Sequence, residues 1–153
     1  MPSRMLSILI PTKDYDCHIL IEELQKQGES LGLPYEIVVG EDGTAEQNLP
    51  MNIVADTLPN CRRVIKKSNI GRARMRNLLA IEARHPYIIF IDSDAVVEKD
   101  NFLECYAQAL KQCDVVCGSL YHAKAQPYKG CSLRYRYEKK ADRYRDASTR
   151  SKA

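Results

Sequence analysis

The most restrictive feature of the sequence is an apolar run at residues 87–91 that ends directly at Asp92-Ser93-Asp94. Apolar residues, mostly β-branched or aromatic, that follow Pro86 are typical of a strand buried on both faces of a parallel sheet. Ligands of open α/β sheets bind beyond the carboxyl ends of the strands. Two carboxylates at such a place favour a divalent cation whose other ligands are diphosphate oxygens, although a solvated turn with a capping aspartate also fits the pattern.

The composition is that of one ordinary globular domain. The chain has 153 residues, of which 44% are hydrophobic and 28% charged, so it is long enough to bury a proper core. No apolar stretch approaches the ~20 residues of a membrane-spanning helix. Residues 1–5 run into a strand-like segment without the apolar core of a signal peptide. We therefore expect a cytoplasmic location, with the inner face of the membrane as a variant of it.

The cysteines do not form a recognisable metal or disulfide pattern. They include no Cys-x-x-Cys pair and no accompanying histidine cluster, so reduced core thiols are the favoured interpretation. The six are Cys17, Cys61, Cys105, Cys113, Cys117 and Cys131.

Charge divides the chain into two parts. Residues 1–123 carry 13 basic and 17 acidic side chains, a net charge of −4, whereas residues 124–153 carry 10 basic and 3 acidic ones, a net charge of +7. We expect a ligand-binding domain over 1–123. The basic segment 124–153 is expected to connect, as a helix, to a further part.

Strand-like and helix-like segments alternate along the chain. Strands are expected at 5–10, 35–39, 63–65, 87–91 and 114–121, with the first stopped by Pro11. Helices are expected at 16–31, at 68–83 and after a capping box of Asn101 and Glu104, with a short one between Pro50 and Pro59. Such alternation predicts an α/β fold with a parallel sheet and helices on both faces. The polar loops 11–16, 40–46 and 92–95 all follow strands and should share one edge of the sheet.

Four linked motifs resemble the family 2 glycosyltransferases of GT-A fold. They are Ser7-Ile-Leu-Ile-Pro-Thr12, Glu36-Ile-Val-Val-Gly-Glu-Asp-Gly-Thr44, Asn69-x-Gly71 with Arg76-Asn77, and Phe90-Ile-Asp-Ser-Asp94. The resemblance spans residues 5–122, in the family's order and spacing. It implies a Rossmann-like, mostly parallel GT-A sheet and inverting transfer of a sugar from a nucleotide-sugar to an acceptor hydroxyl.

The resemblance also implies a site. Asp94 is expected to ligate Mn²⁺ or Mg²⁺ with Asp92 beside it, and Asp42 to read the edge of the base. The expected donor is a UDP-sugar, and the acceptor a saccharide or a lipid-linked molecule. The residues expected to bind the nucleotide-sugar are Pro11, Thr12, Asp14, Asp42, Arg72, Arg76, Asp92 and Ser93.

Each of these positions also has a structural explanation. Asp42-Gly43 is a common turn dipeptide, and Pro11-Thr12 could simply end a strand. Arg72 and Arg76 lie one turn apart where a helix begins, a place that attracts anions, but they also fit a solvated basic face or an ion pair with nearby acids. Asn69 is interpreted as a helix cap. Two departures from the family, Lys13-Asp14 and Glu41, leave the base and its stacking partner open.

The acceptor-binding half of the family has no counterpart after Tyr121. The chain is therefore interpreted as truncated before that half, and the general base is expected beyond Ala153. None of the three histidines, His18, His85 and His122, is placed where a base is needed. The expected activity is that of a glycosyltransferase whose isolated donor-binding part transfers poorly.

Two alternatives remain. One is a nucleotide-sugar-binding module without catalysis. The other, less favoured, is a binder of anionic surfaces or nucleic acids through the basic, tyrosine-rich tail, which contains no known nucleic-acid motif. We expect no nucleic-acid partner, while peripheral membrane association and a homodimer stay open. A dehydrogenase is disfavoured because no Gly-x-Gly-x-x-Gly follows the first strand.

Overall fold

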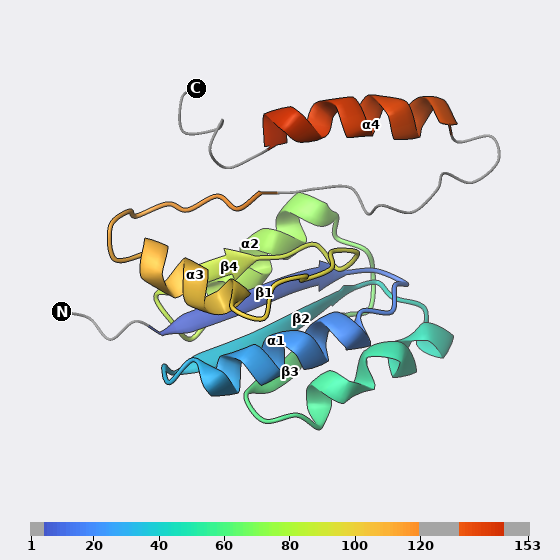
Figure 1. Cartoon of the computed structure of the whole chain (residues 1–153). Coiled ribbons are helices and arrows are strands. Elements are labelled where there is room, and N and C mark those ends of the chain that lie inside the picture. The colour runs from blue at the N-terminus through green and yellow to red at the C-terminus, as the bar shows by residue number, and fades with distance from the viewer. Residues whose placement is uncertain (1–4, 120–131, 146–153) are drawn as a thin grey trace. The chain divides into compact units, whose positions relative to one another are not determined.

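The computed structural model describes residues 5–119 and 132–145 (Figure 1). Its contacts divide the chain into two compact units, residues 1–108 and residues 109–153. The first unit contains four strands and most of the helices. Its strands are β1 (Leu6–Thr12), β2 (Tyr35–Asp42), β3 (Cys61–Lys66) and β4 (Tyr87–Phe90). Its helices are α1 (His18–Ser30), the 3₁₀ segment η1 (Glu46–Asp56), α2 (Arg72–Glu82) and α3 (Phe102–Ala109), which ends at the boundary between the units.

The strands form one parallel sheet in the order β3-β2-β1-β4. Leu6 of β1 lies beside Tyr35 of β2 and Tyr87 of β4, so all three strands start at one edge and point the same way. The carboxyl ends of the strands therefore lie together at the opposite edge, as the alternation of elements predicts. The predicted parallel α/β architecture is confirmed.

Apolar side chains fill both faces of the sheet. Leu9 and Val38 pack with Met75 and Leu79 of α2 in one fully buried cluster. On the other face, the alternate strand residues are buried together with Leu20, Ile21 and Leu24 of α1 and Leu103 of α3. This burial on both faces explains why the strands read as continuous apolar runs.

β1 continues through Pro11 to Thr12, although the sequence predicts a stop at Pro11. The N–H of Ile91 donates to the carbonyl of Leu9 (3.1 Å), so odd-numbered residues of β1 direct their backbone groups toward β4. Since β4 has already ended at Phe90, Pro11 faces no strand carbonyl that requires an N–H, and proline is tolerated there. β2 likewise extends beyond its predicted end at Val39, because β3 pairs with it as far as Asp42.

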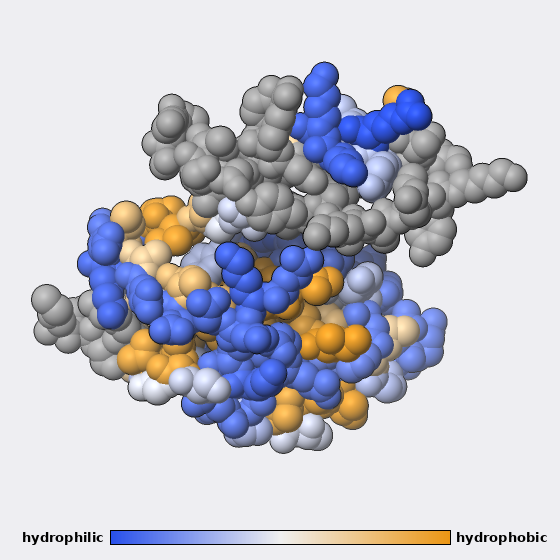
Figure 2. Space-filling view, viewed as in Figure 1, coloured by the Kyte–Doolittle hydropathy of each residue, from blue (hydrophilic) through white to orange (hydrophobic). Residues whose placement is uncertain are grey.

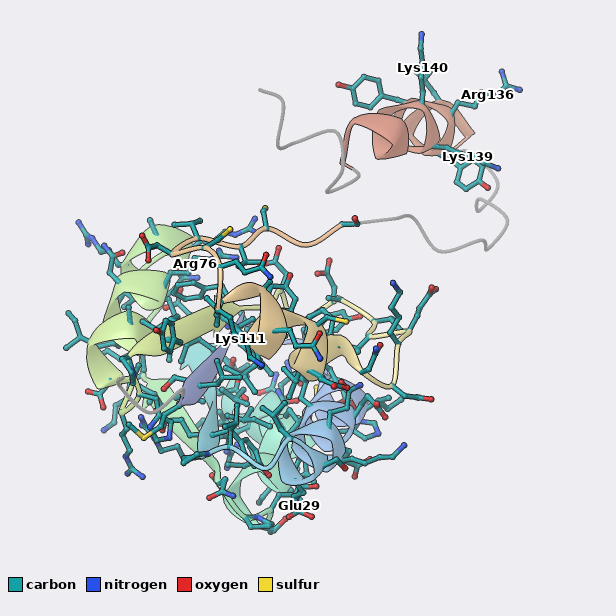
Figure 3. All side chains as sticks on the ribbon, turned by 60° about the vertical axis from the view of Figure 1, so that its left-hand side comes forward. Glu29, Arg76, Lys111, Arg136, Lys139 and Lys140 are labelled. Atoms are coloured by element: carbon teal, nitrogen blue, oxygen red, sulfur yellow. The ribbon has the colours of Figure 1, made fainter. Side chains whose placement is uncertain are left out.

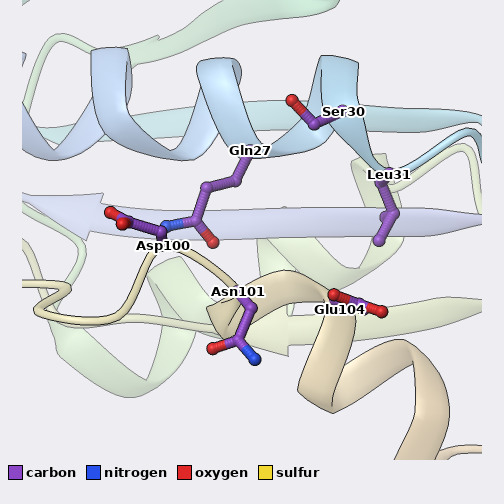
Figure 4. Close-up of a pocket in the computed structure, with 6 residues that line it drawn as sticks. All are labelled: Gln27, Ser30, Leu31, Asp100, Asn101 and Glu104. Carbon is purple, nitrogen blue, oxygen red and sulfur yellow. The ribbon is translucent and has the colours of Figure 1, made fainter.

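The predicted capping box of Asn101 and Glu104 is wrong. Gln27 of α1, which is almost fully buried, accepts from the N–H of Leu103 (3.2 Å) and donates to the carbonyl of Lys99 (2.8 Å). Glu104 instead accepts from Gln108 one turn further along α3. Figure 4 shows Gln27 projecting from α1 toward the segment that begins α3. A tertiary contact thus takes the place of a local cap.

The second unit contains α4 (Ser132–Arg145), which lies in the segment for which the sequence predicts a charged helix. Residues 114–119 form no strand, so the strand predicted at 114–121 is wrong over that part. An extended segment becomes a strand only by pairing. Residues 120–121, His122 and Cys131 lie outside the described residues. No helix in the described ranges has the length and apolar character that a membrane crossing requires.

The cysteines match their interpretation only in part. Cys17 is buried, and burial raises the pKa of its thiol to about 12. Cys61 is half-buried, and burial raises the pKa of its thiol to about 11. Cys105, Cys113 and Cys117 are exposed, so the prediction of core thiols is wrong for them.

Candidate functional site

A cavity of about 500 Å³ opens at the carboxyl edge of the sheet. Its walls come from the ends of β1 and β2, the segment following β4, and the start of α2. The lining residues are Pro11, Thr12, Lys13, Tyr15, Asp42, Asn69, Arg72, Met75, Arg76, Asp92, Ser93 and Asp94. Every residue that the sequence predicts to bind donor or metal is among them, except Asp14. The loops after β1, β2 and β4 therefore do meet at one edge of the sheet, as the sequence predicts.

Asp42 joins the end of β2 to the start of α2. Its two carboxylate oxygens accept from the backbone N–H groups of Ile70 (2.7 Å) and Gly71 (3.0 Å). Gly71 is the N-cap residue, has φ +92° and has no side chain with which to cap the helix. The prediction that Asn69 caps this helix is therefore wrong. Asp42, at the end of a strand distant in sequence, instead holds the two residues that precede α2, and Asn69 lines the cavity.

Asp92 is held by two arginines from α2. Nη2 of Arg72 lies 2.9 Å from Oδ2 of Asp92, and Nη2 of Arg76 bonds to Oδ1. The guanidinium of Arg76 also lies over the ring of Phe90, 5.9 Å from its centre. The two arginines are neighbours at i and i+4, so both reach the same carboxylate. The sequence left open whether Arg72 and Arg76 bind an anion, form a solvated basic face or pair with nearby acids, and in this structure they pair with Asp92.

Asp94 has a different environment from Asp92. Its side chain is exposed at the cavity, and no hydrogen bond or ion pair of it is found among the described residues. No group of three or more acidic, histidine or cysteine side chains in the described residues could hold a metal alone. Magnesium-type ions need few protein ligands when phosphate oxygens and water complete the shell. One open carboxylate beside a second one fits such an ion.

Sequence reasoning missed Tyr15. The family resemblance calls for an aromatic residue directly after Pro-Thr, where this chain has Lys13-Asp14. The aromatic side chain comes two residues later, and Tyr15 lines the cavity with 47% of its surface exposed. Its presence in the polar loop after β1 was the available signal. Lys13 and Met75 also contribute to the lining without having been predicted.

Asp14 lies outside the cavity lining and connects two loops. Its carboxylate accepts from the N–H of Ala45 (2.8 Å) and from Nδ2 of Asn48 (3.0 Å). These hydrogen bonds hold the pKa of Asp14 below its usual value. Residue 14 also has φ +51°, a left-handed conformation that aspartate tolerates better than most residues. Its predicted part in donor binding stays a prediction.

Glu41 and Asn52 support the site from beneath. Glu41 is fully buried and accepts from Oγ1 of Thr44 (2.5 Å) and Nδ2 of Asn52 (3.0 Å). Asn52 also donates to the carbonyl of Tyr15 (2.9 Å) and accepts from the N–H of Cys17 (2.9 Å). The glutamate that departs from the family pattern thus fixes the backbone that carries Tyr15.

Comparison with known proteins identifies relatives of this chain. The family model described as Glycosyl transferase family 2 matches residues 7–150. S. aureus TarS 1–349 in complex with UDP-GlcNAc is 21% identical with a TM-score of 0.65, and the match covers 82% of this chain and 37% of that one. Mannosyltransferase PcManGT from Pyrobaculum calidifontis, in complex with GDP-Man and Mn²⁺, is 20% identical with a TM-score of 0.59, covering 80% and 36%.

A third solved structure is similar to this chain at a comparable level. Glucosyl-3-phosphoglycerate synthase from Mycobacterium tuberculosis, in complex with Mn²⁺, UDP and glucosyl-3-phosphoglycerate, is 20% identical with a TM-score of 0.55, covering 78% of this chain and 45% of that one. No curated protein sequence matches the chain. At these identities the structural likeness shows the fold alone, and it confirms the expected GT-A, Rossmann-like class. The chain spans less than half the length of each of these three structures.

Proposed function

The chain belongs to glycosyl transferase family 2, and from this membership we propose that it carries the donor-binding part of an enzyme that transfers a sugar from a nucleotide-sugar to an acceptor hydroxyl. The observation that carries the proposal is the cavity at the carboxyl edge of the sheet, where Asp94, Arg72 and Arg76 lie together. A nucleoside diphosphate is the ligand whose parts match such a lining. We propose a UDP-sugar as donor and a saccharide or lipid-linked molecule as acceptor.

The diphosphate is assigned to the start of α2. The first N–H groups of a helix and the positive end of its dipole attract anions. Arg72 and Arg76 project from this first part of α2 and can each bind phosphate oxygens by two N–H donors. Lys13, from the loop after β1, adds a third cation to the lining.

The base and ribose are assigned to the other side of the cavity. Tyr15 offers an exposed aromatic face for stacking, and Pro11 and Thr12 border it. Both carboxylate oxygens of Asp42 already accept backbone N–H groups. A carboxylate oxygen can accept a second hydrogen bond, so Asp42 can still receive an N–H from a base edge while it holds α2. Ser93 and Asn69 complete the polar lining.

Asp94 is assigned to a divalent cation, Mn²⁺ or Mg²⁺, with Asp92 as its neighbour. Bound there, such a cation would stabilise the charge that develops on the departing diphosphate. Among the described residues the lining contains no histidine or glutamate, and its three aspartates are already assigned to the base or the cation, so none is left to take the proton of an acceptor hydroxyl. We therefore assign donor binding, and not proton transfer, to this part of the protein.

Isothermal titration calorimetry tests the proposal. UDP, GDP and their sugars are titrated with and without Mn²⁺ into the wild type, Asp94→Ala and Glu98→Ala. Glu98 is an exposed acid from the same loop outside the cavity, which makes it the matched control. We expect Mn²⁺-dependent binding of one nucleotide that is lost in Asp94→Ala and kept in Glu98→Ala. Equal binding by all three proteins would contradict the role of Asp94.

A nucleotide-sugar-binding module without catalysis is the second candidate. It is favoured because the three aspartates of the described lining, Asp42, Asp92 and Asp94, are all assigned to the base or the cation. The two candidates are separated by mass spectrometry of donor and acceptor mixtures after incubation with the protein and Mn²⁺. Formation of a glycosylated product supports the enzyme, whereas tight donor binding without transfer or donor hydrolysis supports the module.

Peripheral membrane association belongs to the proposal because of α4. Arg136, Lys139 and Lys140 project outward from this helix (Figure 3), and Leu133 and Tyr137 are exposed on it. Basic helices with exposed apolar groups bind anionic lipid surfaces. Co-sedimentation with phosphatidylserine vesicles, but not with phosphatidylcholine vesicles, is expected, and exchange of Lys139 and Lys140 for glutamate should abolish it. Retention of binding in that double variant would contradict the role of α4.

A further inference from the structure

Both carboxylate oxygens of Asp92 are paired with arginines, and this affects how a ligand can bind in the cavity. Each of its oxygens holds one guanidinium, Arg72 on Oδ2 and Arg76 on Oδ1. The same arginines are the groups assigned above to the diphosphate. A diphosphate and Asp92 therefore compete for the same pair of cations.

The charges of the lining are balanced without any ligand. Three cationic side chains, Lys13, Arg72 and Arg76, face three anionic ones, Asp42, Asp92 and Asp94. A divalent cation that arrives alone meets two guanidiniums beside Asp92, and a diphosphate that arrives alone meets Asp92 and Asp94. Each ligand by itself is thus opposed by like charge, whereas both together can be matched.

We propose that donor binding exchanges the partners of Asp92. The two guanidiniums leave Asp92 for the diphosphate, and Asp92 then joins Asp94 in facing the divalent cation. The proposal rests on the donor-binding function above and adds that nucleotide and metal bind with strong positive coupling, because one carboxylate is held back until the nucleotide arrives.

The solvent exposure of Asp92 and Arg72 lowers the free energy needed for the exchange. The side chain of Asp92 is 48% exposed and that of Arg72 is 74% exposed. Each ion pair with this much solvent is weak, so a diphosphate can replace it, while the two pairs and their positive charge together still oppose a cation at Asp92. The side chain of Arg76 is 25% exposed and stacks on Phe90, which keeps its guanidinium near the cavity during the exchange. The backbone contacts of Asp42 are not part of the exchange.

Metal binding without nucleotide tests the restraint on Asp92 directly. Mn²⁺ titrations followed by electron paramagnetic resonance compare the wild type with Arg76→Gln and Arg72→Gln. Each variant frees one oxygen of Asp92 and removes one positive charge, so we expect Mn²⁺ affinity to rise about five-fold or more. Arg74→Gln is the matched control, because Arg74 is exposed on the same helix but lies outside the lining, and it should leave the affinity unchanged.

A double variant separates the effect on Asp92 from a general change of charge. If Arg76→Gln acts through Asp92, it should not raise Mn²⁺ affinity in a protein that already carries Asp92→Asn, so the double variant and Asp92→Asn alone should bind Mn²⁺ equally. A gain that persists in the double variant would overturn the proposal. So would unchanged Mn²⁺ affinity in both single variants, with circular dichroism confirming that each is folded.

Nucleotide binding supplies the second arm. In the wild type, UDP should raise Mn²⁺ affinity at least about ten-fold, and Mn²⁺ should raise UDP affinity by the same factor. The coupling should be smaller in Arg76→Gln. If UDP binds normally but the coupling is the same in both proteins, the exchange is overturned and the donor-binding function stands. If no protein binds UDP with or without Mn²⁺, both are overturned.

Discussion

Glu36 is a buried carboxylate at the amino end of the sheet, opposite the cavity. Burial by itself raises the pKa of Glu36, but Oγ of Ser7 (2.6 Å), the N–H of Arg84 (2.6 Å) and Nε of Arg62 (3.2 Å) all donate to it. The hydrogen bonds outweigh the burial, so the pKa of Glu36 is lowered. Its ionised form therefore connects β2 to β1, β3 and the segment before β4.

Glu36→Gln should destabilise the fold in a pH-dependent way. Because the folded pKa is lowered, the charged form contributes stability above the unfolded pKa of about 4.3, and this stability is lost as the pH falls through the folded value. At pH 7 we expect the free energy of unfolding of the variant, measured with urea, to be about 1–3 kcal/mol below that of the wild type. This difference should become smaller below about pH 4. An equal gap at both pH values would show that the charge of Glu36 does not matter.

Asp42 combines a structural contact with its proposed part in donor binding. Removal of its carboxylate leaves the N–H groups of Ile70 and Gly71 without their acceptors at the start of α2. We expect Asp42→Ala to lower the free energy of unfolding by about 2–4 kcal/mol, because hydrogen bonds to charged groups are the stronger kind. Asp14→Ala, which removes an exposed carboxylate with two donors, is the comparison and should cost less. Equal losses in urea unfolding would contradict the special role of Asp42.

At the scale of elements, the turn after β2 depends on Gly43. Its φ is +67°, and a Cβ built on it would lie 2.4 Å from the backbone nitrogen of Asn69. Gly32 has a similar φ of +65°, but a Cβ there would meet no atom within 4 Å. The two glycines therefore differ in crowding and not in backbone conformation.

Alanine at these two positions separates strain from crowding. Gly32→Ala should cost about 1–2 kcal/mol, the usual penalty for a left-handed residue with a Cβ. Gly43→Ala should cost clearly more, because the segment 68–71 must move and take the contacts of Asp42 with it. Urea unfolding measures both costs. Similar losses would mean that the segment yields without resistance.

The elements could be predicted from the sequence where local pattern decides them. The apolar runs of β1, β2 and β4 and the stripe of Met75 and Leu79 are visible because burial on the sheet demands them. Strand ends were less predictable. Pro11 stays in β1 because β4 is shorter, and β2 is long because β3 pairs with it, and neither fact is local.

The candidate site shows the same division. Its place at the carboxyl edge follows from the alternation of elements, and so Asp42, Asp92 and Asp94 were predicted together. The contacts between them were not predictable. The hydrogen bonds of Asp42 to the segment before α2 and the ion pairs of Asp92 join residues 16 to 29 positions apart. Gln27 capping α3 spans 76 positions and displaced a capping box that the local sequence favoured.

At the scale of the molecule, the two outer strands of the sheet, β3 and β4, differ in how they are protected against pairing with another chain. Edge strands invite pairing with another chain unless charges or proline discourage it. β3 carries Arg62, Arg63 and Lys66, whereas Tyr87–Phe90 of β4 contains no charged residue. Among the described strands, β4 pairs with β1 alone. Figure 2 shows apolar patches within a largely hydrophilic surface, and Ile88 (39%) and Phe90 (42%) are among the exposed apolar residues.

This asymmetry predicts self-association of the chain through β4. Sedimentation velocity over a range of concentrations should show a dimer whose population falls in Ile88→Lys, because a lysine on an edge strand opposes pairing. Ile65→Lys is the matched control: Ile65 is 46% exposed on β3, an edge that basic residues already protect. It should leave the association unchanged. A wild type that stays monomeric throughout, or an equal effect of both lysines, would show that β4 does not drive association.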